Sequence, residues 1–198
     1  MNHFNPHDKY FKRAKEEGYR ARSVFKLEGI QSRFHLLKPG MRVLDLGCAP
    51  GSFLQYIGQQ VGEKGVAIGF DLQHINPFLE KQIQAFQVDI YDEAMIHQTL
   101  EHLGVKQFDL ITSDLAPKTT GIPFVDGGAS LELNLQVLAL AKRYLRRGGG
   151  VVMKILSGFN EGDLIGEARK MFKQIKKYRP EAIRKSSHES YLIGLQKI

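Results

Sequence analysis

Two lysines lie in sequence contexts that predict burial, and a buried lysine can do acid–base chemistry. Lys154 interrupts the apolar run from Gly150 to Leu156, and Lys26 lies between Phe25 and Leu27. Burial disfavours an unpaired ammonium group and lowers its pKa, so such a lysine can accept a proton near neutral pH. The alternatives are a Lys154 that extends from its strand to water and a Lys26 that is a solvated residue of an amphipathic helix.

Two carboxylates complete the candidate reactive groups. Asp114 directly follows the apolar run 108–113, and Glu189 precedes the last apolar run of the chain. A carboxylate beside a lysine can hold its ammonium group in place and stabilise its charge. Taken alone, Asp114 could simply cap the end of a strand.

A glycine-rich turn follows the first apolar run, in the segment Asp45-Leu46-Gly47-Cys48-Ala49-Pro50-Gly51. Gly47 and Gly51 allow a sharp turn and a close approach of the backbone to a ligand. The spacing differs from the G-x-G-x-x-G of dinucleotide folds, and Pro50 lacks the backbone N–H that a pyrophosphate would use. The alternative is a tight strand–helix turn without a ligand.

Two further apolar runs also end in acids, Asp71 and Asp89. Asp71 lies twenty positions past Gly51, where a carboxylate can bind two ribose hydroxyls. Asp89 would lie near the amino group of an adenine. Several carboxylates around a turn without phosphate-binding character suit a nucleoside that carries positive charge, and S-adenosylmethionine is such a ligand. Each acid could instead cap the segment that follows it.

Strand-like and helical segments alternate along the chain, which predicts how these groups are positioned. The expected strands are Arg42–Leu46, Val66–Phe70, Phe86–Ile90, Phe108–Ser113, Gly150–Leu156 and Tyr191–Gln196. The expected helices are 8–17, 22–36, 52–60, 92–103, 131–146 and 161–173. The alternation predicts an α/β fold with a largely parallel sheet and helices on both faces. We expect one domain over residues 1–198, with a basic helical extension at 1–38 and the sheet at 39–198.

Charge is divided unevenly along the chain. Residues 1–42 carry ten Lys/Arg and four Asp/Glu, residues 167–198 carry nine and three, and the middle carries nine and fourteen. Two basic ends suit a polyanion such as RNA, whereas solvated helix faces are the alternative. The candidate phosphate contacts are Lys9, Lys12, Arg13, Lys15, Arg20 and Arg22. The interleaved aromatic residues Tyr10, Phe11 and Tyr19 could stack on bases or pack inside the protein.

Composition and motifs exclude several other classes of protein. The single cysteine, Cys48, excludes an internal disulfide framework and a multi-cysteine zinc site. None of the seven histidines has metal-ligand spacing, so we expect no metal. No apolar run approaches the roughly 18 residues of a membrane span, and residues 1–18 have no signal-peptide core. We expect a soluble cytoplasmic protein and, by default, a monomer.

Five segments together resemble the FtsJ/RrmJ family of RNA ribose 2′-O-methyltransferases, to which the large-subunit ribosomal RNA methyltransferases E of bacteria belong. They are Arg20–Leu27, Leu44–Gly51, Ser113–Pro117 with Gly121–Pro123 and Asp126 after it, Val152–Lys154, and Ser187–Tyr191. The resemblance implies a Rossmann-like class I methyltransferase sheet of seven strands with an antiparallel last strand. The chain also lacks the Asn/Asp-Pro-Pro-aromatic segment of enzymes that methylate amines.

The resemblance assigns roles to individual residues. The catalytic tetrad of the family corresponds to Lys26, Asp114, Lys154 and Glu189. S-adenosylmethionine would be held by Gly47, Gly51, Phe53, Asp71, Asp89 and the backbone near Asp114. The chain departs from similar bacterial members at Ser52-Phe53, where Gly-Trp is common, and at His188, where arginine is common. The implied substrate is large-subunit ribosomal RNA; transfer RNA, another RNA and a non-catalytic RNA-binding role are the alternatives.

Overall fold

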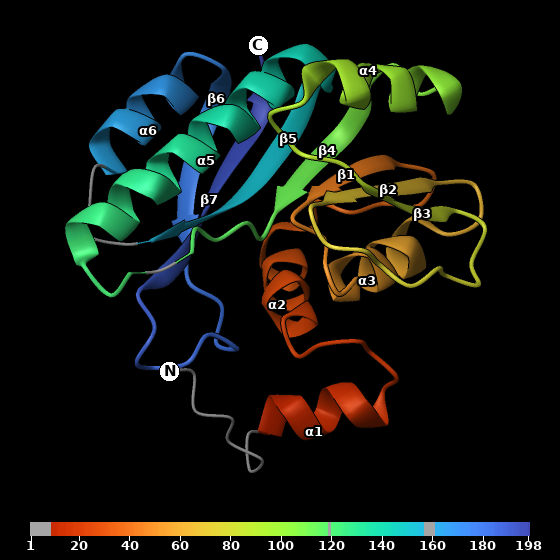
Figure 1. Ribbon diagram of the computed structural model, residues 1–198, viewed down its shortest axis with the longest axis horizontal. Coiled ribbons are helices and arrows are strands. Elements are labelled where there is room, and N and C mark those ends of the chain that lie inside the picture. Colours follow the sequence, from red (N-terminus) through yellow and green to blue (C-terminus); the bar gives the residue numbers. More distant parts are fainter. Residues whose placement is uncertain (1–8, 119, 157–160) are drawn as a thin grey trace.

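The computed structural model describes residues 9–118, 120–156 and 161–198, and one mixed sheet organises them (Figure 1). The strands are β1 (Arg42–Leu46), β2 (Val66–Asp71), β3 (Ile83–Gln87), β4 (Phe108–Ser113), β5 (Leu145–Leu156), β6 (Phe172–Tyr178) and β7 (Glu189–Lys197). Their order is β3-β2-β1-β4-β5-β7-β6. The pairs among β1–β5 are parallel, whereas β7 is antiparallel to both β5 and β6. The expected α/β sheet with an antiparallel last strand is confirmed.

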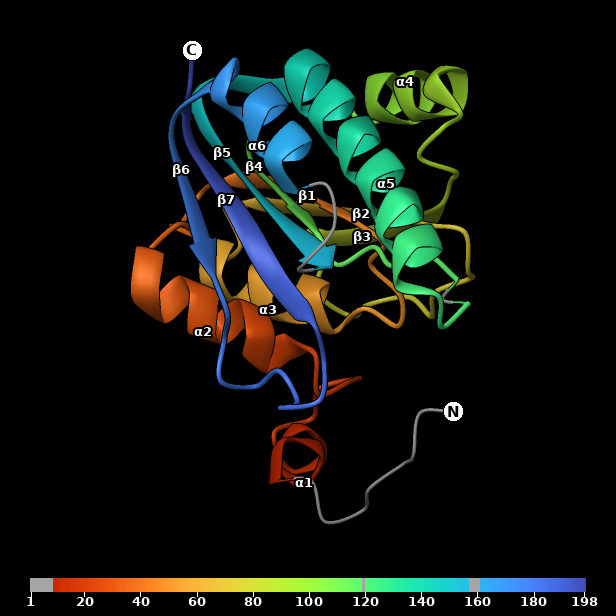
Figure 2. The same ribbon diagram turned by 90° about the vertical axis from the view of Figure 1, so that its left-hand side faces the viewer.

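Helices cover both faces of the sheet, as Figure 2 shows from the side. The helices are α1 (Lys9–Glu16), α2 (Val24–Phe34), α3 (Ser52–Val61), α4 (Glu93–His102), α5 (Pro123–Tyr144) and α6 (Glu161–Arg169). One face packs against α2 and α3, and the opposite face packs against α4, α5 and α6. Helix α1 packs on α2, and Ala14 belongs to one buried cluster with Val24 and Phe25. No helix of the described residues is long and apolar enough to span a membrane.

Alternation along the strands produces the two cores. In β1, Leu44 and Leu46 join the cluster beneath α4–α6, whereas Val43 joins the cluster beneath α2 and α3. Successive side chains of a strand point to opposite faces, so a parallel strand covered on both sides is apolar throughout. Full burial of a residue such as Leu54 stabilises the fold by about 1.5–3 kcal/mol. These cores fix the ends of the strands and thereby the site.

The structure corrects several element boundaries. We predicted a helix over 161–173, but α6 ends at Arg169 and residues 172–178 form β6. This edge strand is rich in lysine, and its apolar residues Phe172 and Ile175 are three apart, so its sequence lacks the strand period. Strand β3 ends at Gln87, two residues before Asp89, so the prediction that Asp89 closes this strand was wrong. Helix α5 begins at Pro123 rather than 131.

Candidate active site

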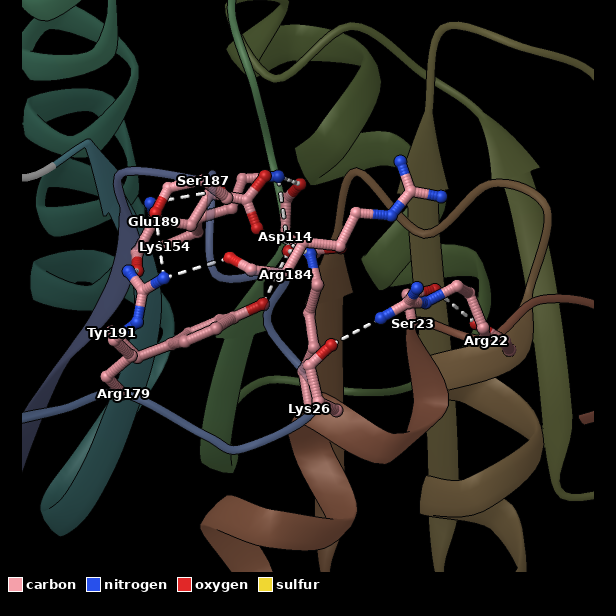
Figure 3. Close-up of polar contacts among 12 residues, drawn as sticks. Arg22, Ser23, Lys26, Asp114, Lys154, Arg179, Arg184, Ser187, Glu189 and Tyr191 are labelled. Carbon is pink, nitrogen blue, oxygen red and sulfur yellow. Dashed lines mark hydrogen bonds and ion pairs between the residues drawn. The ribbon is translucent and has the colours of Figure 1, made fainter. Parts of the chain in front are cut away.

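The four predicted reactive residues converge at the carboxyl edge of the parallel strands (Figure 3). Lys154 lies in β5, and Asp114 directly follows the neighbouring strand β4. Glu189 is the first residue of β7, and Lys26 lies in the first turn of α2, which packs beneath these strands. Segments separated by more than 160 residues are therefore brought together by the order of the sheet.

The carboxylate of Asp114 joins the two lysines. Its Oδ1 atom lies 3.1 Å from Lys154 Nζ and 3.6 Å from Lys26 Nζ. Lys154 Nζ also donates a hydrogen bond to the backbone carbonyl oxygen of Asp114. Glu189 Oε2 accepts a hydrogen bond of 2.9 Å from Lys26 Nζ. The cluster thus balances two basic groups with two acidic groups, and Lys154 is held by two oxygens of one residue.

Burial and neighbouring charges act in opposite directions on the protonation of Lys26 and Asp114. The side chain of Lys154 is 7% exposed and that of Lys26 is 14% exposed. Burial opposes the charged form of Lys26, but the carboxylates of Asp114 and Glu189 outweigh it and raise the pKa of Lys26. Burial would likewise raise the pKa of Asp114, but the two lysines lower it below its usual value. Lys26 and Asp114 are therefore both charged at neutral pH.

Three residues that support the tetrad were not predicted. The hydroxyl of Tyr191, which is fully buried, donates a hydrogen bond of 2.6 Å to Asp114 Oδ1. Asn134 on α5 donates to the backbone oxygen of Lys154 at 3.0 Å. Arg179 donates to the backbone oxygen of Glu189 at 2.7 Å. The two-residue period of a strand places Tyr191 on the same face as Glu189, which is the one signal that could have identified it.

The predicted glycine turn joins β1 to α3 in a crowded environment. Gly47 has φ +74° and Gly51 has φ +112°, in the region that favours glycine. A Cβ atom at Gly47 would lie 2.7 Å from the side chain of Leu115, which follows Asp114. Asp71 holds the turn, because its Oδ2 accepts a hydrogen bond of 2.8 Å from Ala49 N. The turn is therefore packed directly against the segment that carries Asp114.

Two other predicted cofactor residues lie at different depths. Phe53 belongs to the first turn of α3 and is 3% exposed, within the core beneath the turn. Asp89 is exposed beyond β3, and its Oδ1 accepts a hydrogen bond of 3.0 Å from Tyr91 N. The described residues contain no group of three or more His, Cys, Asp or Glu side chains that could hold a metal ion.

Asp45, on β1 just before the turn, is a buried acid with an incomplete set of partners. Its Oδ1 accepts a hydrogen bond of 2.6 Å from Thr112, but its Oδ2 has no partner among the described residues. Burial raises the pKa of Asp45 well above its usual value. A buried carboxyl oxygen without a partner is rare in folded proteins, and a bound group can supply the missing partner.

Comparison with known proteins now identifies the family. Residues 19–197 match the family described as FtsJ-like methyltransferase. This chain belongs to the FtsJ-like methyltransferase family. It is 42% identical over 194 residues to the ribosomal RNA large subunit methyltransferase E of Bdellovibrio bacteriovorus, with 98% of each chain covered. The same protein name and identity apply to a Myxococcus xanthus relative, with 98% of this chain and 91% of the relative covered.

Solved structures resemble this chain in fold. A candidate ribosomal RNA methyltransferase from Plasmodium falciparum superposes with a TM-score of 0.81 at 27% identity, over 90% of this chain and 98% of that one. The fibrillarin of Aeropyrum pernix, solved with natively bound S-adenosyl-L-methionine, has a TM-score of 0.61 at 18% identity, over 89% of this chain and 75% of that one. The second likeness concerns the fold alone.

The predicted RNA-binding residues of this FtsJ-like chain differ in whether their side chains already have partners within the protein. Lys9 and Lys12 on α1 are exposed, whereas Arg13 pairs with Glu17 and Glu28 at 2.6 and 2.9 Å. Figure 1 shows α1 and the segment before β7 on the same side of the molecule. Arg20 and Arg22 lie between α1 and α2, and both donate hydrogen bonds to backbone oxygens of the protein. Arg20 donates to the backbone oxygens of Asn76 and Pro77, and Arg22 donates to that of Ala182.

The aromatic residues of the N-terminal segment pack inside the protein. Tyr10 and Tyr19 lie with ring centroids 5.5 and 6.1 Å from that of Phe25. Of the two interpretations, internal packing therefore describes these two rings, while Phe11 remains 39% exposed.

A cavity of about 350 Å³ opens beside the tetrad, and Arg22, Lys26, Arg184 and Glu189 contribute to its wall. We call it the tetrad cavity.

Proposed function

We propose that this protein transfers a methyl group from S-adenosylmethionine to a ribose 2′-oxygen of large-subunit ribosomal RNA, and that it does so in the cytoplasm as a monomer. The convergence of Lys154 with Asp114, Lys26 and Glu189 carries the proposal. Two lysines and two carboxylates with little exposure are costly to bury in a purely structural or RNA-binding scaffold. The names of the relatives support the choice of RNA.

The cofactor site fits S-adenosylmethionine. The glycine turn lies directly against the segment after Asp114, because Leu115 fills the space beside Gly47, and the orphaned oxygen of Asp45 offers a hydrogen-bonding position to a bound group. Residues Gly47, Gly51, Phe53, Asp71, Asp89 and the backbone at Asp114 would hold the cofactor. When bound, it supplies a methyl group on a positively charged sulfur. An oxygen nucleophile can attack the methyl carbon, and the sulfur is then the leaving group. The turn and the carboxylates of Asp45, Asp71 and Asp89 do not resemble a pyrophosphate site, which uses backbone N–H groups at a helix N-terminus to bind negative charge.

The tetrad divides the acid–base work between its lysines. Lys26 stays protonated, because Asp114 and Glu189 raise its pKa. Lys154 shares Asp114 Oδ1 with Tyr191 and Lys26, so three donors compete for one oxygen. Lys154 is thus the lysine that takes or orients the proton of the ribose hydroxyl as the new oxygen–carbon bond forms. Lys26 Nζ lies 3.6 Å from the Asp114 oxygen that Lys154 also contacts, and Glu189 fixes Lys26.

Positioning supplies most of the rate enhancement in this proposal. Holding the reacting atoms near contact can contribute roughly 7–11 kcal/mol, and a positioned base adds about 10²–10⁴-fold. The buried contacts of Lys154 with two oxygens of Asp114 provide such positioning on the protein side. The proton leaves the hydroxyl for Lys154 Nζ and returns to water when the product departs.

Labelled methyl transfer followed by alkaline hydrolysis tests the reaction. The protein is incubated with methyl-labelled S-adenosylmethionine and, in separate arms, large-subunit RNA, assembled large subunits and transfer RNA. Ribose methylation removes the hydroxyl that base uses to cleave RNA, so the label should survive in alkali-resistant dinucleotides. Label in mononucleotides would refute ribose methylation, and label confined to transfer RNA would refute the ribosomal target. Lys154→Ala is the control for contaminating activity.

A further inference from the structure

A second cavity lies next to the tetrad cavity and has no role in the reaction described above. It is an open hollow of about 380 Å³ between α1, α2, the end of β6 and the residues that follow it. Tyr10, Arg13, Phe25, Glu28, Tyr178 and Glu181 line it, and we call it the α1–α2 cavity. Both cavities use Ala182 as a wall, so they are direct neighbours.

The walls of the α1–α2 cavity suit a flat ring. Tyr10 on α1 and Tyr178 at the end of β6 are partly exposed in this cavity, whereas Phe25 is 3% exposed and packs against Tyr10 as part of its floor. The guanidinium of Arg13 lies 4.2 Å from the centre of the Phe25 ring. Aromatic faces and planar guanidinium groups are the surfaces on which proteins stack nucleobases. The cavity is also larger than the space that a single base requires.

Charge distinguishes the two cavities. The α1–α2 cavity has two arginines, Arg13 and Arg33, and two glutamates, Glu28 and Glu181. This balance favours a neutral ligand that has both hydrogen-bond donors and acceptors. The tetrad cavity instead has three basic residues, Arg22, Lys26 and Arg184, with Glu189 as its one acid. Its excess positive charge favours phosphate, so the pair matches the alternation of backbone and base in RNA.

The path between the cavities is short and fixed. Phe25 and Lys26 are consecutive residues of α2, and one contributes to each cavity. Arg22 bonds the backbone oxygen of Ala182 and thereby ties α2 to the shared wall. An RNA strand with one ribose at the tetrad therefore passes within reach of the α1–α2 cavity with an adjacent or nearby nucleotide.

We propose that the α1–α2 cavity binds an unstacked nucleobase of the RNA substrate, at a position other than the methylated nucleotide. This inference rests on the proposed function. Glu181 and Arg33 lie at the rim and are exposed, so they are the groups that read the edge of the base. The cavity then contributes to the choice of RNA sequence, whereas the tetrad performs the chemistry on any ribose presented to it.

Abasic substrates combined with protein variants test the inference. In the wild-type protein, removal of one particular base near the target should raise KM about 5-fold or more, which is the effect of losing one stacked base. The double variant Glu181→Ala/Arg33→Ala loses the groups that read the base edge but keeps the aromatic walls, so its KM with intact RNA should be raised, and the same abasic RNA should raise it further by a clearly smaller factor than in the wild type. Its kcat should equal that of the wild type, because neither residue touches the tetrad.

Matched controls make the result decisive. Glu63→Ala/Lys64→Ala removes the same pair of charges from an exposed turn before β2 and should leave KM unchanged. Unchanged KM in the Glu181/Arg33 variant, or equal sensitivity of both proteins to every abasic position, would overturn the base site. If the wild-type protein methylates no RNA at all, the proposed function fails instead, so the two failures are distinguishable. Thermal melting verifies that both variants are folded.

Discussion

Replacing Tyr191 by Phe measures how much the tetrad depends, in stability and in turnover, on the hydrogen bond from the Tyr191 hydroxyl to Asp114. The substitution keeps the ring, which packs in the core beneath α2, and removes only the hydroxyl that donates to Asp114 at 2.6 Å. A hydrogen bond to a charged group contributes about 1.5–3 kcal/mol. For a chain of this size, that loss lowers the melting temperature by about 3–12 °C at neutral pH. We also expect kcat to fall at least about 10-fold, because Asp114 positions Lys154 less firmly.

The effect of Tyr191→Phe should depend on pH. Burial alone would raise the pKa of Asp114, but Lys26, Lys154 and the Tyr191 hydroxyl lower it below its ordinary value. A group with a lowered folded-state pKa stabilises the protein above its unfolded pKa of about 3.9, and this contribution is lost as pH falls through the folded value. The stability difference between wild type and variant should therefore be largest at neutral pH and should shrink below about pH 4.

The chain contains a matched control for this experiment. Tyr144 is also buried, but its hydroxyl has no hydrogen-bond partner among the described residues. Tyr144→Phe removes an unpaired polar group, so its melting temperature should be unchanged or slightly higher, and kcat should be unchanged. Equal melting temperatures and equal kcat for the two variants across the pH range would refute the argument that Tyr191 orients Asp114.

Three other predictions follow from the same geometry. Lys154→Ala should lower kcat by about 10²–10⁴-fold while calorimetry still detects S-adenosylmethionine binding; near-normal turnover would disprove its role. Gly47→Ala should abolish cofactor binding, because the new Cβ meets Leu115 at 2.7 Å, and intact affinity would contradict this account of the turn. Lys9→Glu/Lys12→Glu should weaken RNA binding and flatten its salt dependence in filter-binding assays, and an unchanged slope would exclude phosphate contacts there.

Lys154 and Asp114 could be singled out from the residues themselves, whereas the grouping of these two with Lys26 and Glu189 came from the family resemblance. Lys154 interrupts an apolar run, and Asp114 follows another; the structure places both side chains at the same sheet edge. Asn134 could not be found in this way, because its partner is the backbone oxygen of Lys154, twenty residues away on another element. Tyr191 belongs to a segment that the sequence analysis singled out, but its hydrogen bond to Asp114 depends on the pairing of β5 with β7, which the sequence does not reveal.

The charge pattern along the chain predicted less about individual residues. The excess of lysine and arginine at both ends is real, but Arg13 and Arg20 form ion pairs or hydrogen bonds within the protein. Composition counts charges and does not reveal which of them have internal partners. Likewise, β6 escaped prediction because an edge strand needs few apolar residues, and its lysines protect the exposed edge from aggregation.

The position of β7 determines how much of the chain must be synthesised before the tetrad is complete. This strand follows β6 in the chain, yet it inserts between β5 and β6 and brings Glu189 and Tyr191 to the tetrad. A nascent chain that has emerged only as far as β6 therefore contains the glycine turn and both lysines but lacks two of their neighbours. Methyl transfer therefore requires that β7 has emerged and paired with β5, so chains that stop before Glu189 would be inactive rather than unselective.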